Sequence, residues 1–356
     1  RYAASPDQFA TIALLRAARM AWGRVSEVCG VGSEARGQRQ HAVTSALTWT
    51  RRDPYVNLLR GTISAFAAGV GGADAVTVAP FDAALRPPAS FSRRIAGNTQ
   101  TLLIAESHVA AVIDPAGGSW YVEQRTVELA EAAWAFFQEL ETAGGAVPAL
   151  DSGMLAERLA AVAERRQRAV ATRQTPLIGV SEFADPAETL LPGHTPSGPG
   201  RSGGLPRIRL AAPYEELRDR ADAAAEHGGR RPRVFLASLG PVGTHAVRVQ
   251  FVRNLLQAGG IEAPDAGPTA DVPAVATAFA AERTPVAVLC ASDRLYAERA
   301  ADTVVALRQA GASLVLLAGK PSDPPVPGID GYLSAGGDAL GVLEQVWTAL
   351  APREAS

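Results

Sequence analysis

Residues that build metal clusters and disulfide frameworks are scarce in this sequence. Its 356 residues include two cysteines, Cys29 and Cys290, and five histidines. The two cysteines lie far apart, and neither belongs to a cluster with the spacing of a zinc or iron–sulfur site, which argues against such metal centres. Isolated thiols are typical of a reducing compartment, so we expect a cytoplasmic protein.

A basic surplus and long apolar runs are also lacking. Lysine and arginine together number 34 against 36 aspartates and glutamates, and Lys320 is the one lysine. A protein that binds nucleic acid or an anionic membrane would carry a basic surplus or a basic face. No apolar run approaches the roughly 20 residues that cross a bilayer, and the first residues lack the charged start and apolar stretch of a signal peptide. We therefore expect neither nucleic acid nor membrane as a partner.

What is present is the composition of a folded protein. Of its residues 47% are hydrophobic and 20% charged, which is enough apolar side chain to build cores and excludes wholesale disorder. The length is typical of two domains. A tract rich in proline, glycine and serine, residues 191–204, cannot pack into a core. We therefore predict a first domain at residues 1–183, a linker at 184–231 that contains a short solvent-facing helix, and a second domain at 232–356.

The second domain is predicted to be α/β with a parallel sheet. Several short runs in it are apolar throughout, as strands buried on both faces are, and they alternate with helical patterns. The predicted strands are residues 234–237, 286–290, 314–318 and 332–333. We expect a flavodoxin-like, doubly wound sheet whose ligand site lies beyond the carboxyl ends of the strands.

The first domain is mostly helical, with strands predicted only near residues 40–47 and 75–79. Asp53 and Pro54 are typical of an N-cap and a first-turn proline, so a helix is expected to follow. Two β-α pairs do not form a stable sheet alone, and a (β/α)8 barrel of the TIM type needs about 250 residues. If this is barrel sequence, the chain holds only its C-terminal portion. Because the chain does not start with methionine, a truncated N-terminus is expected.

A few side chains are candidates for chemistry. His41 starts a predicted strand, where it could bind a ligand, but a hydrogen-bonded structural role is favoured. His108 follows Glu106 and Ser107 at a helix end, and a helix-terminal role is favoured over membership of a catalytic triad, which only geometry identifies. Residues 113–123, Ile-Asp-Pro-Ala-Gly-Gly-Ser-Trp-Tyr-Val-Glu, predict a tight structural turn.

The run Ser-Leu-Gly-Pro-Val-Gly-Thr-His at residues 238–245 follows the first strand of the second domain. It superficially resembles a phosphate-binding loop. It has neither the Gly-x-Gly-x-x-Gly spacing nor the Gly-Lys-Ser/Thr ending of such loops, so it is a weak nucleotide motif. Its place after a strand still makes His245 a candidate ligand-site residue.

Four motifs occur in order along the chain. They are His41 with Thr44-Ser45, Asp53-Pro54-Tyr55 and Asn57; residues 93–100 (Arg-Arg-Ile-Ala-Gly-Asn-Thr-Gln); residues 114–123 (Asp-Pro-Ala-Gly-Gly-Ser-Trp-Tyr-Val-Glu); and residues 176–180 (Pro-Leu-Ile-Gly-Val). In this order they resemble the methylmalonyl-CoA mutase family, whose second and third motifs read Ala-Arg-Ile-Ala-Arg-Asn-Thr-Gln and Asp-Pro-Trp-Gly-Gly-Ser-Tyr-Tyr-Val-Glu. The likeness runs through residues 8–180 and resumes, weaker, over 233–350.

The resemblance implies an acyl-CoA-binding barrel followed by a cobalamin-binding, flavodoxin-like domain. The family interconverts succinyl-CoA and methylmalonyl-CoA by radical rearrangement, and adenosylcobalamin supplies the radical. Its cobalt is held by the histidine of an Asp-x-His-x-x-Gly loop, and the aspartate orients that imidazole.

The sequence departs from the family where the cofactor would bind. The Asp, His and Gly of the loop correspond to Gly240, Val242 and His245. The family's Ser-x-Leu motif corresponds to Ala-Ser-Asp around Ser292, and its later Gly-Gly to Gly319 and a lysine. In the barrel, the family's His-Thr-Asn corresponds to Thr-Val-Ala at residues 77–79. A valine has no donor atom for cobalt, so we expect no catalytic residue, no bound cofactor and no metal in this chain.

Retained body motifs beside lost ligand motifs resemble the small, non-catalytic subunit of heterodimeric members of the family. That resemblance implies a large catalytic partner subunit, which holds adenosylcobalamin, and an acyl-CoA substrate at the level of the complex. Two alternatives stay open at this point. One is an active mutase in which His245 ligates cobalt after a loop rearrangement, and the other is a module that binds CoA alone.

Overall fold

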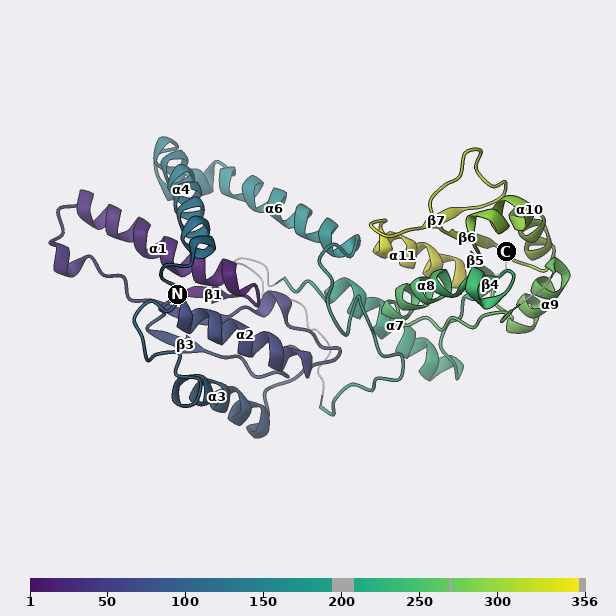
Figure 1. The fold of residues 1–356 in the computed structure, drawn as a ribbon, viewed down its shortest axis with the longest axis horizontal. Helices are drawn as coiled ribbons and strands as arrows, with labels where there is room; N and C mark the ends of the chain where they lie inside the picture. The colour runs from purple at the N-terminus through teal and green to yellow at the C-terminus, as the bar shows by residue number, and fades with distance from the viewer. Residues whose placement is uncertain (194–207, 269–270, 352–356) are drawn as a thin grey trace. The chain divides into compact units, whose positions relative to one another are not determined.

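The computed structural model describes residues 1–193, 208–268 and 271–351. The chain divides into two compact units, one made of Arg1–Arg165 with Leu190–Leu210 and the other of Arg166–Thr189 with Ala211–Ser356. Each unit has its own parallel β-sheet (Figure 1). Most of the predicted proline-, glycine- and serine-rich tract, with His194, lies outside the described residues.

The sheet of the first unit has three parallel strands in the order β1-β2-β3. They are β1 (Tyr2–Ala4), β2 (His41–Thr44) and β3 (Ala75–Thr77), so β2 is central and β1 and β3 form the edges. Strands near β2 and β3 were predicted, whereas β1 was not. The unit therefore holds three β-α pairs instead of two.

Helices α1 (Gln8–Val28), α2 (Val56–Val70) and α3 (Ser90–Ala105) follow these strands in turn. Figure 1 shows α2 lying between α1 and α3, and both neighbours contact it. Small side chains on the strands and on α2 allow close packing, with Ala4, Ala42 and Ala68 buried around Leu15. This packing places the helices against one face of the sheet.

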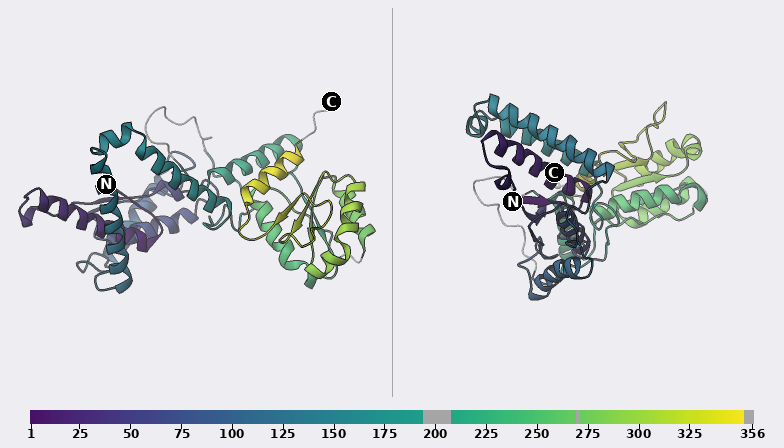
Figure 2. Two further views of the ribbon diagram at one scale, coloured as in Figure 1. Left: turned by 90° about the horizontal axis from the view of Figure 1, so that it is seen from above. Right: turned by 60° about the vertical axis from the view of Figure 1, so that its left-hand side comes forward.

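Three further helices follow along the chain, and the boundary between the two units falls within the last of them. Helix α4 (Trp120–Thr142) lies along α1, as the right-hand view of Figure 2 shows, and is followed by the short α5 (Ala146–Asp151) and by α6 (Met154–Ala171). Val122 in the first turn of α4 packs against α1 and α2. Most side chains in the second half of α4 are exposed, so this helix is held mainly at its N-terminal end.

The sheet of the second unit is parallel in the order β4-β5-β6-β7. Its strands are β4 (Phe235–Ser238), β5 (Val286–Cys290), β6 (Leu314–Ala318) and β7 (Gly331–Leu333). Residues 262 and 265 bridge to residues 233 and 236 on the free side of β4, also in parallel. In chain order the sheet therefore reads 2-1-3-4-5. Because β4, β5 and β6 are buried along their whole length, the predicted parallel α/β sheet is confirmed.

Helices cover both faces of this sheet (Figure 2). On one face α9 (Val272–Glu282) and α10 (Asp293–Gln309) pack against alternate residues of β4, β5 and β6. Helices α8 (Ala246–Ala258) and α11 (Ala339–Leu350) also contact the strands. None of the helices that the structure describes is both long and apolar enough to cross a membrane.

The helix predicted to face solvent within the linker is α7 (Ala212–Gly228), and that prediction is wrong. Tyr214 is fully buried, and Arg218 is buried although it is charged. The Arg218 guanidinium lies 3.2 Å from the Glu188 carboxylate and donates to the carbonyl oxygen of Gly179. Because these charges are paired inside the second unit, a charged sequence forms a packed helix there.

Candidate functional site

The residues predicted at the cofactor positions lie at one edge of the sheet in the second unit. Gly240 follows β4, Ser292 follows β5 and Gly319 follows β6. These three strands are adjacent and parallel, so their carboxyl ends meet at the edge where α/β sheets bind ligands. The structure therefore brings the three loops together, as the resemblance implies.

The loop after β4 is closed by its own residues. Gly240 has a φ of 77°, in the left-handed region that favours glycine. A Cβ added there would lie 2.9 Å from Leu295 Cδ1 and 3.0 Å from Thr244 Oγ1. The Thr244 hydroxyl lies 2.6 Å from the Pro241 carbonyl oxygen and 2.9 Å from that of Leu239. An aspartate at position 240 would require this loop to change shape.

Two residues of the same loop differ sharply in exposure. Val242 is 55% exposed in a short 3-10 helix (Val242–Thr244), where it offers no donor atom. His245 precedes α8 and is buried, and its carbonyl oxygen accepts the Val249 amide of the first helical turn. The His245 Nδ1 has no hydrogen-bond partner among the described residues. The loop thus presents a valine outward and keeps its histidine inside.

Tyr296 of α10 lies between the ends of β5 and β6. Its hydroxyl lies 3.0 Å from the Leu289 carbonyl oxygen and 2.9 Å from that of Ala318, and it accepts the Ala291 amide at 3.0 Å. The phenol thus joins the carboxyl ends of β5 and β6. Burial raises the pKa of Tyr296, so the hydroxyl stays protonated.

Arg248 of α8 covers the Tyr296 ring. Its guanidinium carbon lies 4.9 Å from the ring centroid, and its nitrogens donate to the Ala291 carbonyl oxygen and the Asp293 carboxylate. A Cβ added at Gly319 would lie 3.8 Å from Tyr296 Cε2 and 3.9 Å from Arg248 Cζ. The point where the loops after β5 and β6 meet is therefore occupied by an arginine stacked on a tyrosine.

A cavity of about 1000 Å³ remains beside this pair, bounded by α8, α10 and the loop after β6. Gly319 is the one predicted position that lines it, together with Val247, Arg248, Phe251, Tyr296 and Lys320. His245 does not line it. Among the described residues no group of three or more His, Cys, Asp or Glu side chains could hold a metal ion. The cavity is lined by both apolar and charged side chains.

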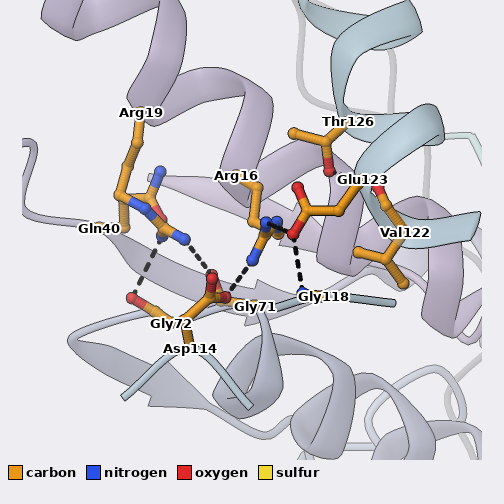
Figure 3. Close-up of polar contacts among 10 residues, drawn as sticks. All are labelled: Arg16, Arg19, Gln40, Gly71, Gly72, Asp114, Gly118, Val122, Glu123 and Thr126. Carbon is orange, nitrogen blue, oxygen red and sulfur yellow. Dashed lines mark hydrogen bonds and ion pairs between the residues drawn. The ribbon is translucent and has the colours of Figure 1, made fainter. Parts of the chain in front are cut away.

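In the first unit, the predicted turn at residues 113–123 forms a clamp on α1 (Figure 3). Arg16 pairs with Asp114 and lies 2.7 Å from the Glu123 carboxylate, which also accepts the Gly118 amide at 3.1 Å. The hydrogen bond from the Gly118 amide lowers the pKa of Glu123 the most, and the hydrogen bond from Arg16 lowers it further. Because Asp114 and Glu123 both hold α1, the interpretation of this run as a structural turn is confirmed.

A second arginine extends the clamp to the start of the sheet. Arg19 donates to Gln40 Oε1 and to the Gly71 carbonyl oxygen, both at 2.7 Å (Figure 3). Gln40 directly precedes β2, and Gly71 lies just before β3, so these contacts lie at the amino edge of the sheet. Ligand sites of parallel α/β folds lie at the opposite edge. The clamp, with a cavity of about 410 Å³ beside it, therefore has a structural role.

The two candidate histidines of the first unit lie in different surroundings. His41 Nε2 lies 2.8 Å from Thr77 Oγ1 and links β2 to β3, in agreement with the favoured structural role. His108 lies in an exposed loop beyond the end of α3, with a φ of 51°.

Comparison with known proteins decides the family. The sequence model described as methylmalonyl-CoA mutase matches residues 1–197, more than half of the chain. The chain belongs to the methylmalonyl-CoA mutase family. It is 53% identical over 344 residues to the "Methylmalonyl-CoA mutase small subunit" of Streptomyces virginiae, a match that covers 96% of this chain and 55% of that protein.

Some of the other relatives are named as the small subunit and others as the mutase. Identity to the "Methylmalonyl-CoA mutase small subunit" of Propionibacterium freudenreichii subsp. shermanii is 42% over 323 residues, covering 90% of this chain and 49% of that protein. The "Methylmalonyl-CoA mutase" of Cereibacter sphaeroides matches 53% of this chain at 39% identity, which is 27% of its own length. The resemblance to the family and to its small subunit is confirmed. The chain spans about half the length of the curated small subunits it matches.

Sequence reasoning about this mutase-family chain identified the loops of the candidate site but missed Arg248 and Tyr296. Tyr296 stands four residues after Ser292, and Arg248 lies one turn into α8. Both occupy ordinary helical positions, so only their place at the carboxyl edge of a parallel sheet could have drawn attention to them.

Proposed function

We propose that this chain is the small, non-catalytic subunit of a heterodimeric methylmalonyl-CoA mutase and acts in the cytoplasm. In this proposal a large partner subunit holds adenosylcobalamin, and the complex interconverts succinyl-CoA and methylmalonyl-CoA. The chain itself supplies no catalytic residue and stabilises its partner. The observation that carries the proposal lies at the carboxyl edge of the second sheet, where Tyr296 and Arg248 occupy the point at which the loops after β5 and β6 meet.

The residues at this edge do not fit a cobalamin. An axial ligand to cobalt needs a nitrogen donor, and Val242 at the corresponding position has none. The orienting aspartate has no counterpart, because Gly240 stands at its position in a left-handed conformation, where a Cβ would press on Leu295 and Thr244. The third position is His245, where the family pattern has a glycine, and its side chain is buried. All three positions lie in one loop, and none of them carries the residue that the family pattern has there.

The fold supports the same assignment. We infer that the first unit is the C-terminal portion of a (β/α)8 barrel, because three parallel β-α pairs occur in sequence and the described residues pair with neither outer edge of the sheet. We infer that the second unit is flavodoxin-like, because its strand order of 2-1-3-4-5 is the order of that fold. Both match the architecture that the resemblance implies.

The test compares this chain alone with the chain co-expressed with a large mutase subunit from the same genome. Each sample is incubated with adenosylcobalamin and desalted, and retained cobalamin is measured from its visible spectrum. We expect co-elution of the two subunits, one equivalent of cobalamin and mutase activity in the complex, and no cobalamin on this chain alone. Separate elution of the subunits, or an equivalent of cobalamin on this chain alone, would overturn the proposal.

A variant with a restored donor tests the filled edge. Val242→His supplies an imidazole but leaves Tyr296 and Arg248 in place, so we expect it to retain no cobalamin. Retention by Val242→His would mean that the missing donor alone, and not the filled space, keeps cobalamin out.

A further inference from the structure

Helix α2 exposes an apolar face to solvent. Tyr55, Leu59, Ile63 and Phe66 follow one another at spacings of four, four and three residues, which places them on one side of a helix. They are 55%, 65%, 40% and 37% exposed, and Phe91 at the start of α3 is 52% exposed. These five side chains are called the α2 surface below.

The α2 surface lacks the polar character of a helix that faces water. The one charged residue between Val56 and Val70 is Arg60, and it is buried. A helix that is apolar on its outer as well as its inner face is typical of one buried on both sides. At about 200 Å² for a large side chain, the exposed fractions amount to about 500 Å² of apolar surface. That is in the range of functional patches and is more than half of the roughly 800 Å² that each partner contributes to a standard interface.

Aromatic residues extend this surface at one end. Tyr55 stacks on Phe81 with ring centroids 5.3 Å apart, and Phe81 meets Phe91 at 6.4 Å. The guanidinium of Arg94 lies 5.6 Å above the Phe91 ring. Aromatic residues and arginine are the types enriched at the energetic centres of protein interfaces. The surface therefore has the composition of an interface core with a charged rim.

The remainder of a barrel would not cover this face. Further β-α pairs would add at the outer edges of the sheet, beside β1 and β3. Helix α2 already has the sheet beneath it, α1 on one side and α3 on the other (Figure 1). The described residues of the first unit thus give α2 the neighbours that a barrel gives a helix, and they leave the side chains on its outer face exposed.

We propose that the α2 surface docks on the large subunit of the mutase. This inference rests on the proposed function, since a small subunit must present a face to a larger one. A second copy of this chain is the competing occupant. The proposal commits to the large subunit because the relatives that match most of this chain are named small subunits.

The test uses the polypeptide that contains residues 1–356, co-expressed with the large subunit. Leu59→Glu and Ile63→Glu place a carboxylate in the middle of the α2 surface, and Leu159→Glu on α6 is the matched control because Leu159 is 55% exposed. We expect affinity for the large subunit, measured by surface plasmon resonance, to fall about 100-fold in either test variant and less than threefold in the control. Melting curves of the free variants show that each still folds.

If a variant does not fold, hydrogen exchange of the unmutated protein still tests the proposal. Hydrogen exchange should slow in peptides spanning residues 55–66 when the large subunit is added, and not in peptides spanning 154–165. Unchanged affinity of both folded variants, or unchanged exchange of residues 55–66 in a complex that forms, overturns this inference and leaves the proposed function standing. Loss of a homodimer instead of the heterodimer overturns it in favour of a second copy. Failure of the wild-type subunits to associate overturns the proposed function itself.

Discussion

Replacement of Tyr296 by phenylalanine separates the contribution of its hydroxyl to the stability of the second unit from the contribution of its ring, which packs under Arg248. The Ala291 amide donates to this hydroxyl and lies in a fully buried part of the second unit. Tyr296→Phe keeps the ring under Arg248 but leaves that amide without its partner. An unsatisfied buried donor costs about 1–3 kcal/mol. We therefore expect the free energy of unfolding of the second unit to fall by about 2 kcal/mol.

Calorimetry of the whole chain measures this effect as a shift of one transition. About 2 kcal/mol corresponds to a lowering of the melting temperature by about 4–8 °C for a unit of this size. Tyr332→Phe is the matched control, because the Tyr332 hydroxyl makes no hydrogen bond to the described residues and its loss should shift the transition by less than about 1 °C. Equal melting temperatures of Tyr296→Phe and the wild-type chain would refute the argument that this hydroxyl joins β5 to β6.

The same pair of proteins gives a pH dependence with a defined sign. Burial raises the pKa of Tyr296 above its ordinary value of 10.0. Folding therefore favours the neutral phenol, whose stabilisation is fully present below about pH 10 and is lost as the pH rises from there through the folded-state pKa. Tyr296→Phe has no such proton to lose. The difference in melting temperature between the two chains should be constant from pH 7 to 9 and should narrow above pH 10, and a constant difference up to pH 11 would contradict the buried phenol.

The remaining predictions concern the polar contacts that hold each unit together. Arg16→Met removes both carboxylate contacts of the clamp and should lower the first unit's melting temperature by about 3 °C or more, whereas Arg24→Met, in an exposed pair, should change it by less than 1 °C. Asn57→Ala removes an amide whose hydrogen bonds join five groups, and calorimetry should show a loss of about 2–3 kcal/mol, with less than about 0.5 kcal/mol contradicting that role. Arg218→Met removes a buried guanidinium that pairs with Glu188 and donates to the Gly179 carbonyl oxygen, and it should cost about 2–4 kcal/mol in urea unfolding, against less than about 1 kcal/mol for the half-exposed Arg220→Met.

The fold could be predicted best where burial is complete. The apolar runs at Val286–Cys290 and Leu314–Ala318 gave the bounds of β5 and β6, because strands covered on both faces admit no polar residue. Strand β1, with three residues, is too short to carry a periodic pattern. The helix after Asp53 begins at Val56 instead, since Asp53 has a φ of 43° and its carbonyl oxygen accepts the Val56 amide in a turn. Side-chain chemistry alone does not distinguish that turn from an N-cap.

The candidate site was predictable only in its loops. Gly240, Ser292 and Gly319 follow three strands, and strand order in a parallel sheet brings such positions together. What fills the space between them depends on which side chains of α8 and α10 turn toward the edge. That orientation follows from helix register against the sheet, and a sequence pattern dominated by alanine and arginine does not specify it. The burial of Arg218 on α7 was also missed, because its partners Glu188 and Gly179 lie more than 25 residues away in the sequence and no local pattern marks them.

The proposed function requires a second unit that folds without a cofactor, and the contacts at its carboxyl edge bear on that requirement. Parallel sheets leave polar backbone groups at the carboxyl ends of their strands, and a bound ligand commonly satisfies some of them. Here the Tyr296 hydroxyl accepts the Ala291 amide, and the Arg248 guanidinium donates to the Ala291 carbonyl oxygen. Hydrogen bonds from within the chain thus take the place of contacts that a ligand would make. Under the proposed function, these contacts would let the second unit fold with Val242 at the position of the cobalt ligand.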